Sequence, residues 1–426
     1  MVNFRNYFAI VFFILATKGV NAQDTLTSAI VDQKTFQLFA DKNWTELITF
    51  GNHAIDKGFD YYYLQLRVGI AYYEKKNYAL AEGYFLKALK FNSDDELILE
   101  YIYYCYLFNG RYDEARVWSK KFSTSLAEKI GTDKLSKVSL IMVEAGTKVT
   151  DQKNYYSEGT RTNSNYFNPP VYAQVGLNHY IKNKVSLFHA ITYFNQETFV
   201  NKVSQTQYFL KASIPFKHNW SISPSFDLIH IKNTTEVQSV STSQGSGNST
   251  PKRPRPSINV SQSNYLVGSL FLQKMVKKFV FGLGTSVSNM NNKTQFIHSG
   301  FTSYSPLGNS KIILGTTLYA HTVDSYNTTC LAVSPFIYFQ PIKRLSIKFS
   351  YLYNTNNNII EDNGYSVNNS PDLTQSRYSA LLNFSINKKV SLYGLYQLEN
   401  KQEVVQLFNY KYNVFVAGIR ITPFKK

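Results

Sequence analysis

The chain has 426 residues, of which 44% are hydrophobic, 16% aromatic and only 17% charged. A soluble enzyme needs more surface charge, whereas a membrane β-barrel needs an apolar wall and interfacial aromatic residues. The net charge of +17 is unevenly divided, because residues 23–133 hold 13 basic and 16 acidic side chains, against 30 and 12 in residues 134–426. This asymmetry indicates two different domains.

The first 22 residues predict a signal peptide. Arg5 supplies a basic start, residues 7–16 are apolar, and Ala22 closes a stretch of small residues suited to cleavage. The apolar stretch is shorter than the roughly 20 residues that span a bilayer. We therefore expect the mature protein beyond the inner membrane. No later segment has 18 consecutive apolar residues, which argues against a helical membrane protein.

Residues 28–129 repeat with a period of 34. Trp44, Tyr78 and Tyr112 have this spacing, and Gly69 and Phe85 mark the clearest unit. The pattern is similar to tetratricopeptide repeats, in which a small residue lets two helices approach and a large residue fills the space beside it. We therefore expect a helical repeat domain over residues 23–133.

The resemblance implies a concave face that docks another protein, lined by the first helix of each pair. The residues expected on this face are Tyr63, Leu66, Ile70, Tyr73, Glu100 and Tyr104. The alternative is that these side chains pack neighbouring helices. Three repeats are close to the minimum for stability, so the array is expected to lean on the second domain or on a partner.

From about residue 137 the hydrophobic period changes to two. Between Leu345 and Tyr353, apolar residues alternate with Ser346, Lys348 and Ser350. Runs of about ten such residues suit tilted transmembrane strands. The expected fold class is thus α plus membrane β, with a barrel of about 14 antiparallel strands (12–16) over residues 134–426. A soluble β-sandwich or propeller is the alternative, which the low charge disfavours.

Short Lys-rich turns alternate with longer polar segments at 151–165, 236–256 and 354–375. This asymmetry is typical of outer-membrane barrels, whose tight turns face the periplasm. An even strand number leaves both ends of the barrel on that side. The helical domain is therefore expected in the periplasm.

The order of signal peptide, short repeat array and barrel resembles YaiO-like outer-membrane proteins and similar Bacteroidota proteins. The last strand, residues 412–424, is similar to the aromatic-ended signal that barrel-assembly machinery recognises, although Lys425 and Lys426 follow it. The resemblance implies a cell outer-membrane location and carries no individual functional residue.

Nothing in the sequence predicts a catalytic, cofactor or metal site, and we expect no enzyme activity. The histidines lack paired metal spacing, although His179 and His189 flank one predicted hairpin. A membrane hydrolase needs only Ser, His and a polar orienting group, so the sequence leaves that alternative open. Cys105 and Cys330 lie in different domains, which disfavours a disulfide.

Two basic features are candidate contact sites. A Ser/Gly/Pro-rich loop predicted to be extracellular contains Lys252, Arg253 and Arg255, which either grip phosphate or acidic sugars or remain solvated. Lumen-facing polar candidates are Lys211, Lys348 and Arg377. Lipid and lipopolysaccharide are the expected surroundings of the barrel, and export argues against nucleic acid.

Two functional hypotheses follow. The first is a non-enzymatic barrel whose repeat domain docks a periplasmic or outer-membrane protein of an assembly, secretion or export complex. The second is a porin-like conduit for an anionic polysaccharide or solute, with the basic barrel as its selectivity surface. The mixed polar and aromatic lumen residues favour the first, because a wide water channel needs a more uniformly polar interior.

Overall fold

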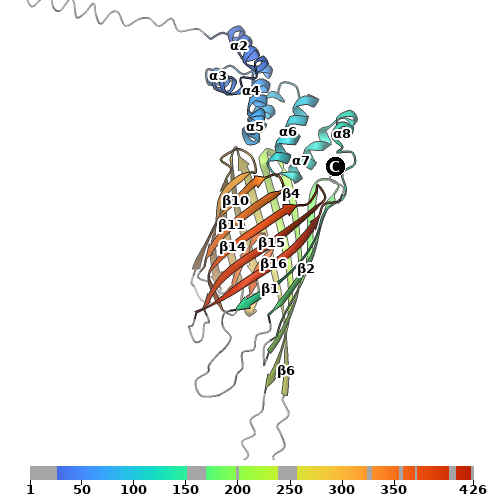
Figure 1. The fold of residues 1–426 in the computed structure, drawn as a ribbon, viewed down its shortest axis with the longest axis vertical. Coiled ribbons are helices and arrows are strands. Elements are labelled where there is room, and N and C mark those ends of the chain that lie inside the picture. The colour runs from blue at the N-terminus through green and yellow to red at the C-terminus, as the bar shows by residue number, and fades with distance from the viewer. Residues whose placement is uncertain are drawn as a thin grey trace, which may run out of the picture.

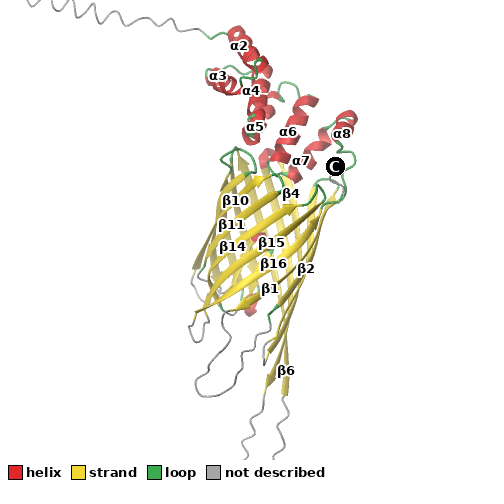
Figure 2. Cartoon of the chain, in the orientation of Figure 1, coloured by secondary structure: helices red, strands yellow, loops and turns green. Residues whose placement is uncertain are grey.

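The computed structural model describes residues 26–150, 169–197, 201–237, 257–323, 329–354, 358–369, 372–402 and 409–423. It forms a barrel with helices gathered at one end (Figures 1 and 2). The predicted signal peptide and the basic residues Lys252, Arg253 and Arg255 lie outside the described residues. Within the described part of the chain, no helix is both long enough and apolar enough to cross a membrane.

The helical domain begins at Ser28 and ends at Ile130. Its helices are α2 (Ser28–Ala40), α3 (Trp44–Asp56), α4 (Tyr62–Glu74), α5 (Tyr78–Ala88), α6 (Glu96–Phe108), α7 (Tyr112–Trp118), η1 (Ser119–Lys121) and α8 (Thr124–Ile130). Short polar side chains begin several of them. Asn43, Asn77 and Asp95 each accept a backbone N–H from the first turn of the helix that follows, which satisfies a donor that the helix itself cannot pair.

Small residues bring neighbouring helices close together. A Cβ atom at Gly69 of α4 would lie 2.8 Å from the ring of Phe85 on α5, and one at Gly51 of α3 would lie 2.4 Å from Val68. Phe85 is fully buried in the core between α4, α5 and α6. The Gly69 and Phe85 positions of the repeat therefore act as a matched pair.

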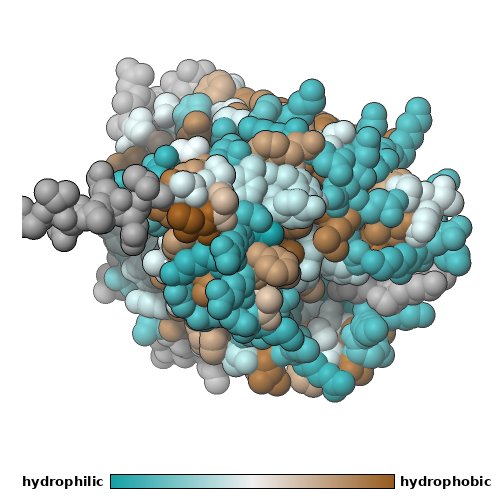
Figure 3. Space-filling model, turned by 90° about the horizontal axis from the view of Figure 1, so that it is seen from above, coloured by the Kyte–Doolittle hydropathy of each residue, from teal (hydrophilic) through white to brown (hydrophobic). Residues whose placement is uncertain are grey.

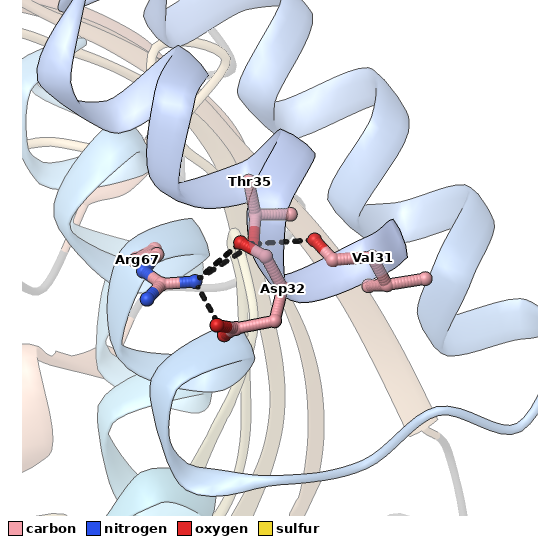
Figure 4. Close-up of polar contacts among 4 residues, drawn as sticks. All are labelled: Val31, Asp32, Thr35 and Arg67. Carbon is pink, nitrogen blue, oxygen red and sulfur yellow. Dashed lines mark hydrogen bonds and ion pairs between the residues drawn. The ribbon is translucent and has the colours of Figure 1, made fainter. Parts of the chain in front are cut away.

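Arg67 fixes the first helix against the third. Its Nη1 atom donates to the carbonyl and carboxylate oxygens of Asp32 and to the hydroxyl of Thr35, at 3.0, 2.7 and 2.9 Å (Figure 4). These contacts join α4 to α2 across 35 residues of chain. Because the guanidinium is buried, its loss would leave unpaired groups in the interface.

The barrel strands are β1 (Val138–Thr150), β2 (Val171–Ile181), β3 (Val185–Glu197), β4 (Asn201–Phe216), β5 (Trp220–Val237), β6 (Ser257–Val276), β7 (Phe279–Ser288), β8 (Gln295–Tyr304), β9 (Ile312–Val323), β10 (Thr329–Ile342), β11 (Leu345–Tyr353), β14 (Leu373–Ser385), β15 (Val390–Gln402) and β16 (Asn409–Ile421). Each pairs with its neighbours antiparallel, and β1 also pairs with β16, from Ile141 opposite Ile421 to Thr150 opposite Tyr412. The predicted antiparallel barrel of about 14 strands is confirmed.

The strand faces divide into an apolar outside and a mixed inside. Phe281 and Leu283 of β7 are exposed on the outer face, whereas Phe271 of β6 is buried inside. Outward apolar side chains recur on every strand from β1 to β11 and β14 to β16. An apolar band around a closed sheet is suited to lipid, so the fold is that of an outer-membrane β-barrel.

The two ends of the barrel differ. At the end that carries the helices (the helix end), strands are joined by short turns such as 182–184, 217–219 and 343–344. Positive φ angles at Lys182, Asn183, His218 and Asn219 make two of these turns tight. The opposite end (the loop end) carries the longer connections, and β5 and β6 extend beyond their neighbours there (Figure 1).

The Phe85→Ala variant is expected to destabilise the helical domain by about 3–5 kcal/mol, because it leaves a cavity where a buried ring packs. The measurement is thermal unfolding of the full chain in detergent, followed by the far-ultraviolet helical signal. Phe91→Ala is the matched control, because that ring is 51% exposed. Equal shifts of the two midpoints would contradict the packing described.

Candidate functional site: the barrel lumen and its helical cover

The connection between β11 and β14 folds into the barrel. It contains β12 (Asn358–Glu361), the turn η4 (Asp362–Gly364) and β13 (Ser366–Asn369), which we call the lumen hairpin. Ile359 and Ile360 are 2% and 3% exposed. They pack in one apolar cluster with inward residues of the wall, among them Ile229, Val267, Ile297 and Leu352.

The sequence showed residues 354–375 only as one of the longer polar segments between strands, and it did not predict that part of this segment folds into the barrel. Removing two adjacent isoleucines from water lowers the free energy of the folded protein. Inside the barrel, they pack against the inward apolar residues of the wall. Burial of the pair brings the polar residues around it inside as well.

The tip of the hairpin lies against β5 and β6. Gly364 has a φ of +90°, and a Cβ atom there would lie 2.8 Å from Ser225 Oγ and 2.9 Å from Ser269 Oγ. Ser225 Oγ also donates to the carbonyl of Asn363 at 2.5 Å. Glycine thus satisfies both the turn geometry and the close approach to the wall.

Two side-chain contacts anchor the body of the hairpin. The ring of Tyr365 packs against Phe188 and Phe209, with centroids 5.8 and 5.3 Å away, and its hydroxyl donates to Gln174 at 2.5 Å. Glu361 forms a buried ion pair with Arg377 of β14. A buried charge pair holds its partners firmly, because separating them leaves an uncompensated charge.

The lumen contains basic and acidic groups in contact. Lys148 lies 3.6 Å from Glu399, and Glu144 accepts hydrogen bonds from Tyr172 and Tyr393. The guanidinium of Arg420 lies 4.1 Å from the centroid of the Tyr393 ring. The large positive charge of the barrel domain therefore does not become an unbalanced cationic interior.

A cavity of about 820 Å³ remains beside the hairpin. Its lining combines amides and hydroxyls with aromatic rings, for example Gln205, Gln397, Ser299, Thr317, Phe301 and Tyr393. Hydrogen-bonding groups next to ring faces suit a small polar solute.

The structure places the three lumen candidates at different sites. Arg377 and Lys348 line the main cavity. Arg377 forms an ion pair with Glu361, and the ammonium of Lys348 lies 4.9 Å from the Phe336 ring centroid. Lys211 lines a smaller cavity nearer the helix end. The structure therefore does not bring the three together in one basic surface.

The helical domain is fixed to the barrel rim through α7. Arg116 donates to Asn183 at 2.8 Å and to the carbonyl of Ser136 at 2.6 Å, and its guanidinium lies 4.0 Å from the Tyr180 ring centroid. Asp113 accepts a hydrogen bond from the Tyr180 hydroxyl at 2.6 Å. Burial raises the pKa of Asp113, and this hydrogen bond opposes the rise in part.

A second set of contacts joins the helices to the turn between β8 and β9. Ala79 N–H donates to the carbonyl of Gly308 at 2.9 Å, and Asn309 Nδ2 donates to that of Lys76 at 2.9 Å. Ser310 Oγ donates to the carbonyl of Phe108 at 3.1 Å. The helices are thus held on two sides of the rim and lie across the barrel mouth, presenting a mixed polar and apolar surface (Figure 3).

The helices that lie across the barrel mouth, which we call the helical cover, approach the lumen hairpin inside the mouth. The smaller cavity, of about 270 Å³, is lined by residues 110–114 of the cover, by Asn363 of the hairpin and by Lys211 of the wall. Lys211 interacts electrostatically with Asp362 of the hairpin and Asp113 of the cover. Residues of the cover, the hairpin and the wall therefore line this cavity together.

The residues expected on a concave docking face have mixed positions. Leu66 and Ile70 are buried in the core and leave little surface for a partner, and the ring of Tyr73 packs against Tyr78, Tyr101 and Phe108. Tyr63 is exposed. The other two are partly exposed, Glu100 in an ion pair with Lys129 and Tyr104 stacked on Phe108.

The structure brings together one pair of the histidines that the sequence singled out. His179 and His189 do approach across their hairpin, with rings stacked at 5.1 Å. Among the described residues, no group of three or more His, Cys, Asp or Glu side chains is placed to hold a metal. Cys105 and Cys330 are both free thiols.

Comparisons with known proteins find structural likeness at low similarity. No protein-family model matches the chain, and no curated protein matches it. The Pseudomonas putida toluene transporter TodX superposes with a TM-score of 0.46 and 8% identity, covering 69% of this chain and 92% of TodX. The CymD monoaromatic hydrocarbon channel gives 0.43 and 8%, covering 69% and 91%. These values carry no inference about cargo.

Tyr365→Ala is expected to loosen the lumen hairpin, because it removes two ring contacts and the hydrogen bond to Gln174. A loss of about 3 kcal/mol, typical of a buried aromatic replaced by alanine, corresponds to amide exchange roughly 100-fold faster. The measurement is hydrogen exchange of residues 358–369 in lipid nanodiscs. Tyr353→Ala, an outward-facing ring on β11, is the control. Unchanged exchange in Tyr365→Ala would contradict the anchoring role.

Proposed function

We propose that this chain is a gated outer-membrane conduit for small polar solutes without net charge, with its helix end in the periplasm. The observation that carries the proposal is the cavity of about 820 Å³ inside a closed barrel. The lumen hairpin and the helical cover act as two gates in series. Passage requires that both move away from the lumen axis.

The way the hairpin is held supports its role as a gate. Apart from its apolar pair, it depends on a few side chains, chiefly Glu361 and Tyr365. The wall beside it combines an apolar patch with hydroxyl and amide groups, and water can replace the hairpin's hydrogen bonds when the hairpin moves away. A segment held by few contacts opens at a lower free-energy cost than the strands of the barrel.

The charge arrangement supports a solute without net charge over an anionic polymer. Arg377 and Lys148 are each neutralised by a carboxylate. An anion entering the lumen meets Glu144, Glu361 and Glu399 as well as the basic groups. The net positive charge of the barrel domain therefore does not give an anion a continuous path of basic groups through the lumen.

A second candidate function is docking of a partner protein on the helical domain, whose repeats resemble tetratricopeptide units. Phe36 and Tyr63 are 58% and 57% exposed. Both rings flank the Arg67 guanidinium, at 5.3 and 5.4 Å from its carbon. Exposed aromatic residues beside an arginine are common at interfaces. In this case the barrel serves as an anchor within lipid and lipopolysaccharide.

Solute flux into proteoliposomes tests the conduit. The variants are replacement of residues 358–369 by a Gly-Ser linker of equal length, Arg116→Ala in the helical cover, and the two combined. The combined variant is expected to take up a neutral disaccharide roughly tenfold faster than the unaltered chain, because it opens a polar lumen. A sugar acid of similar size should enter more slowly.

Lys129→Ala is the matched control for the helical cover, because Lys129 pairs with Glu100 within the helical domain and not with the barrel. It should leave flux at the level of the unaltered chain. Flux from all variants equal to that of empty liposomes would overturn the conduit and leave docking as the remaining candidate.

A further inference from the structure

Strand β6 forms one edge of the extended sheet at the loop end. Strand β6 pairs with β5 from Val237 opposite Ser257 to Trp220 opposite Lys274. Its other neighbour, β7, pairs with it only from Val267 onward. Among the described residues, no strand pairs with the β7 side of residues 258–264, which we call the β6 edge.

The opposite side of this extension is covered. β4 pairs with β5 as far as Asn201 opposite Thr235, and β3 pairs with β4 as far as Glu197 opposite Lys202. The extension is thus a sheet that grows from the barrel wall and ends at β6. Figure 1 shows β6 and the strand paired with it, β5, reaching beyond the rest of the barrel at this end.

The β6 edge lacks the features that usually prevent strand addition. Natural edge strands carry charged residues, proline or a bulge that stop another chain from pairing. Residues 258–264 read Ile-Asn-Val-Ser-Gln-Ser-Asn, without charge or proline, and their register with β5 is regular. Ile258 and Val260 are 61% and 54% exposed, and Asn259, Ser261 and Gln262 are exposed as well.

We infer that the β6 edge is a strand-addition site for an extended segment of another polypeptide. Every second residue of the edge directs its N–H and C=O groups away from β5, and only an extended backbone matches that row of donors and acceptors. The neutral side chains favour a segment without charge. Its apolar residues would lie on the side of Ile258 and Val260, and its polar residues on the other.

A second copy of this chain does not fit the edge in the preferred arrangement. Copies inserted in one membrane have the same orientation, so their β6 strands run in the same direction. Antiparallel pairing between copies is therefore excluded, and parallel pairing is the less stable kind. A separate polypeptide can approach in either direction. This inference does not depend on whether the lumen conducts.

Hydrogen exchange of the full chain in nanodiscs tests the inference first. Alternate amides of residues 258–264 should exchange fast, while those directed at β5, and all amides of β6 within the wall, stay protected. Protection of the whole edge at every dilution would mean that the chain covers it itself. Protection that grows with protein concentration would mean self-pairing. Either result overturns the proposal.

The second step adds a synthetic octapeptide of alternating Thr and Val with solubilising ends. The fast amides should become protected, and a peptide N-methylated at alternate residues should have no effect, because it cannot form the ladder. The double variant Asn259→Lys and Ser261→Lys should bind the peptide roughly tenfold more weakly, as expected of a guarded edge. Thr234→Lys, on the paired strand β5, is the matched control and should bind normally. Equal protection by both peptides would overturn the proposal.

Discussion

The closed ring of backbone hydrogen bonds is the constraint on which the rest of the structure depends. In lipid, an open strand edge costs several kcal/mol for each unsatisfied group, and pairing of β1 with β16 removes that edge. Fourteen is an even number, so the barrel begins and ends at the same rim. The helical domain, which precedes β1, must lie at that rim, and its Arg116 and Asp113 find their partners there.

Closure also creates the space that the hairpin occupies. A barrel of this size encloses more volume than its inward side chains fill. The lumen hairpin takes up part of that volume with Ile359, Ile360 and Tyr365, and leaves the main cavity beside it. The hairpin and the helical cover meet near Lys211.

The sequence was most informative where structure is local. Period-two alternation marked the strands, because each side chain faces either lipid or lumen, and the 34-residue spacing placed Gly69 and Phe85 together. The hairpin was not predictable in this way, because a polar loop enters a lumen only through contacts with distant strands. Glu361 pairs with Arg377, and Tyr365 reaches Gln174, 191 residues away along the chain. Ile359 and Ile360 were the available signal, since two adjacent isoleucines are unusual in a solvated loop.

The sequence led us to expect that the helical array leans on the barrel or on a partner, but the residues that hold it there were not predictable, for a related reason. Arg111, Asp113 and Arg116 lie in the third repeat, and in the sequence they look like ordinary surface charges of a helix. Their partners, Asn219, Tyr180 and Asn183, belong to barrel turns and strands. The expected concave-face residues Leu66 and Ile70 turned out to be core, because the repeat pattern alone does not separate a groove from a helix–helix contact.

Single-channel current through a chain whose hairpin is covalently locked to the wall tests most directly whether the lumen hairpin is a gate. A Cβ atom at position 364 would lie 3.5 Å from that of Ser269, within the range of a disulfide. The positive φ at 364 costs a non-glycine residue about 1–2 kcal/mol, which the covalent bond offsets. The Ser225 hydroxyl, 2.8 Å from the new Cβ atom, must rotate away. The Gly364→Cys, Ser269→Cys chain should be silent when oxidised and show openings after reduction. Openings that are unchanged by the disulfide would contradict the hairpin as a gate.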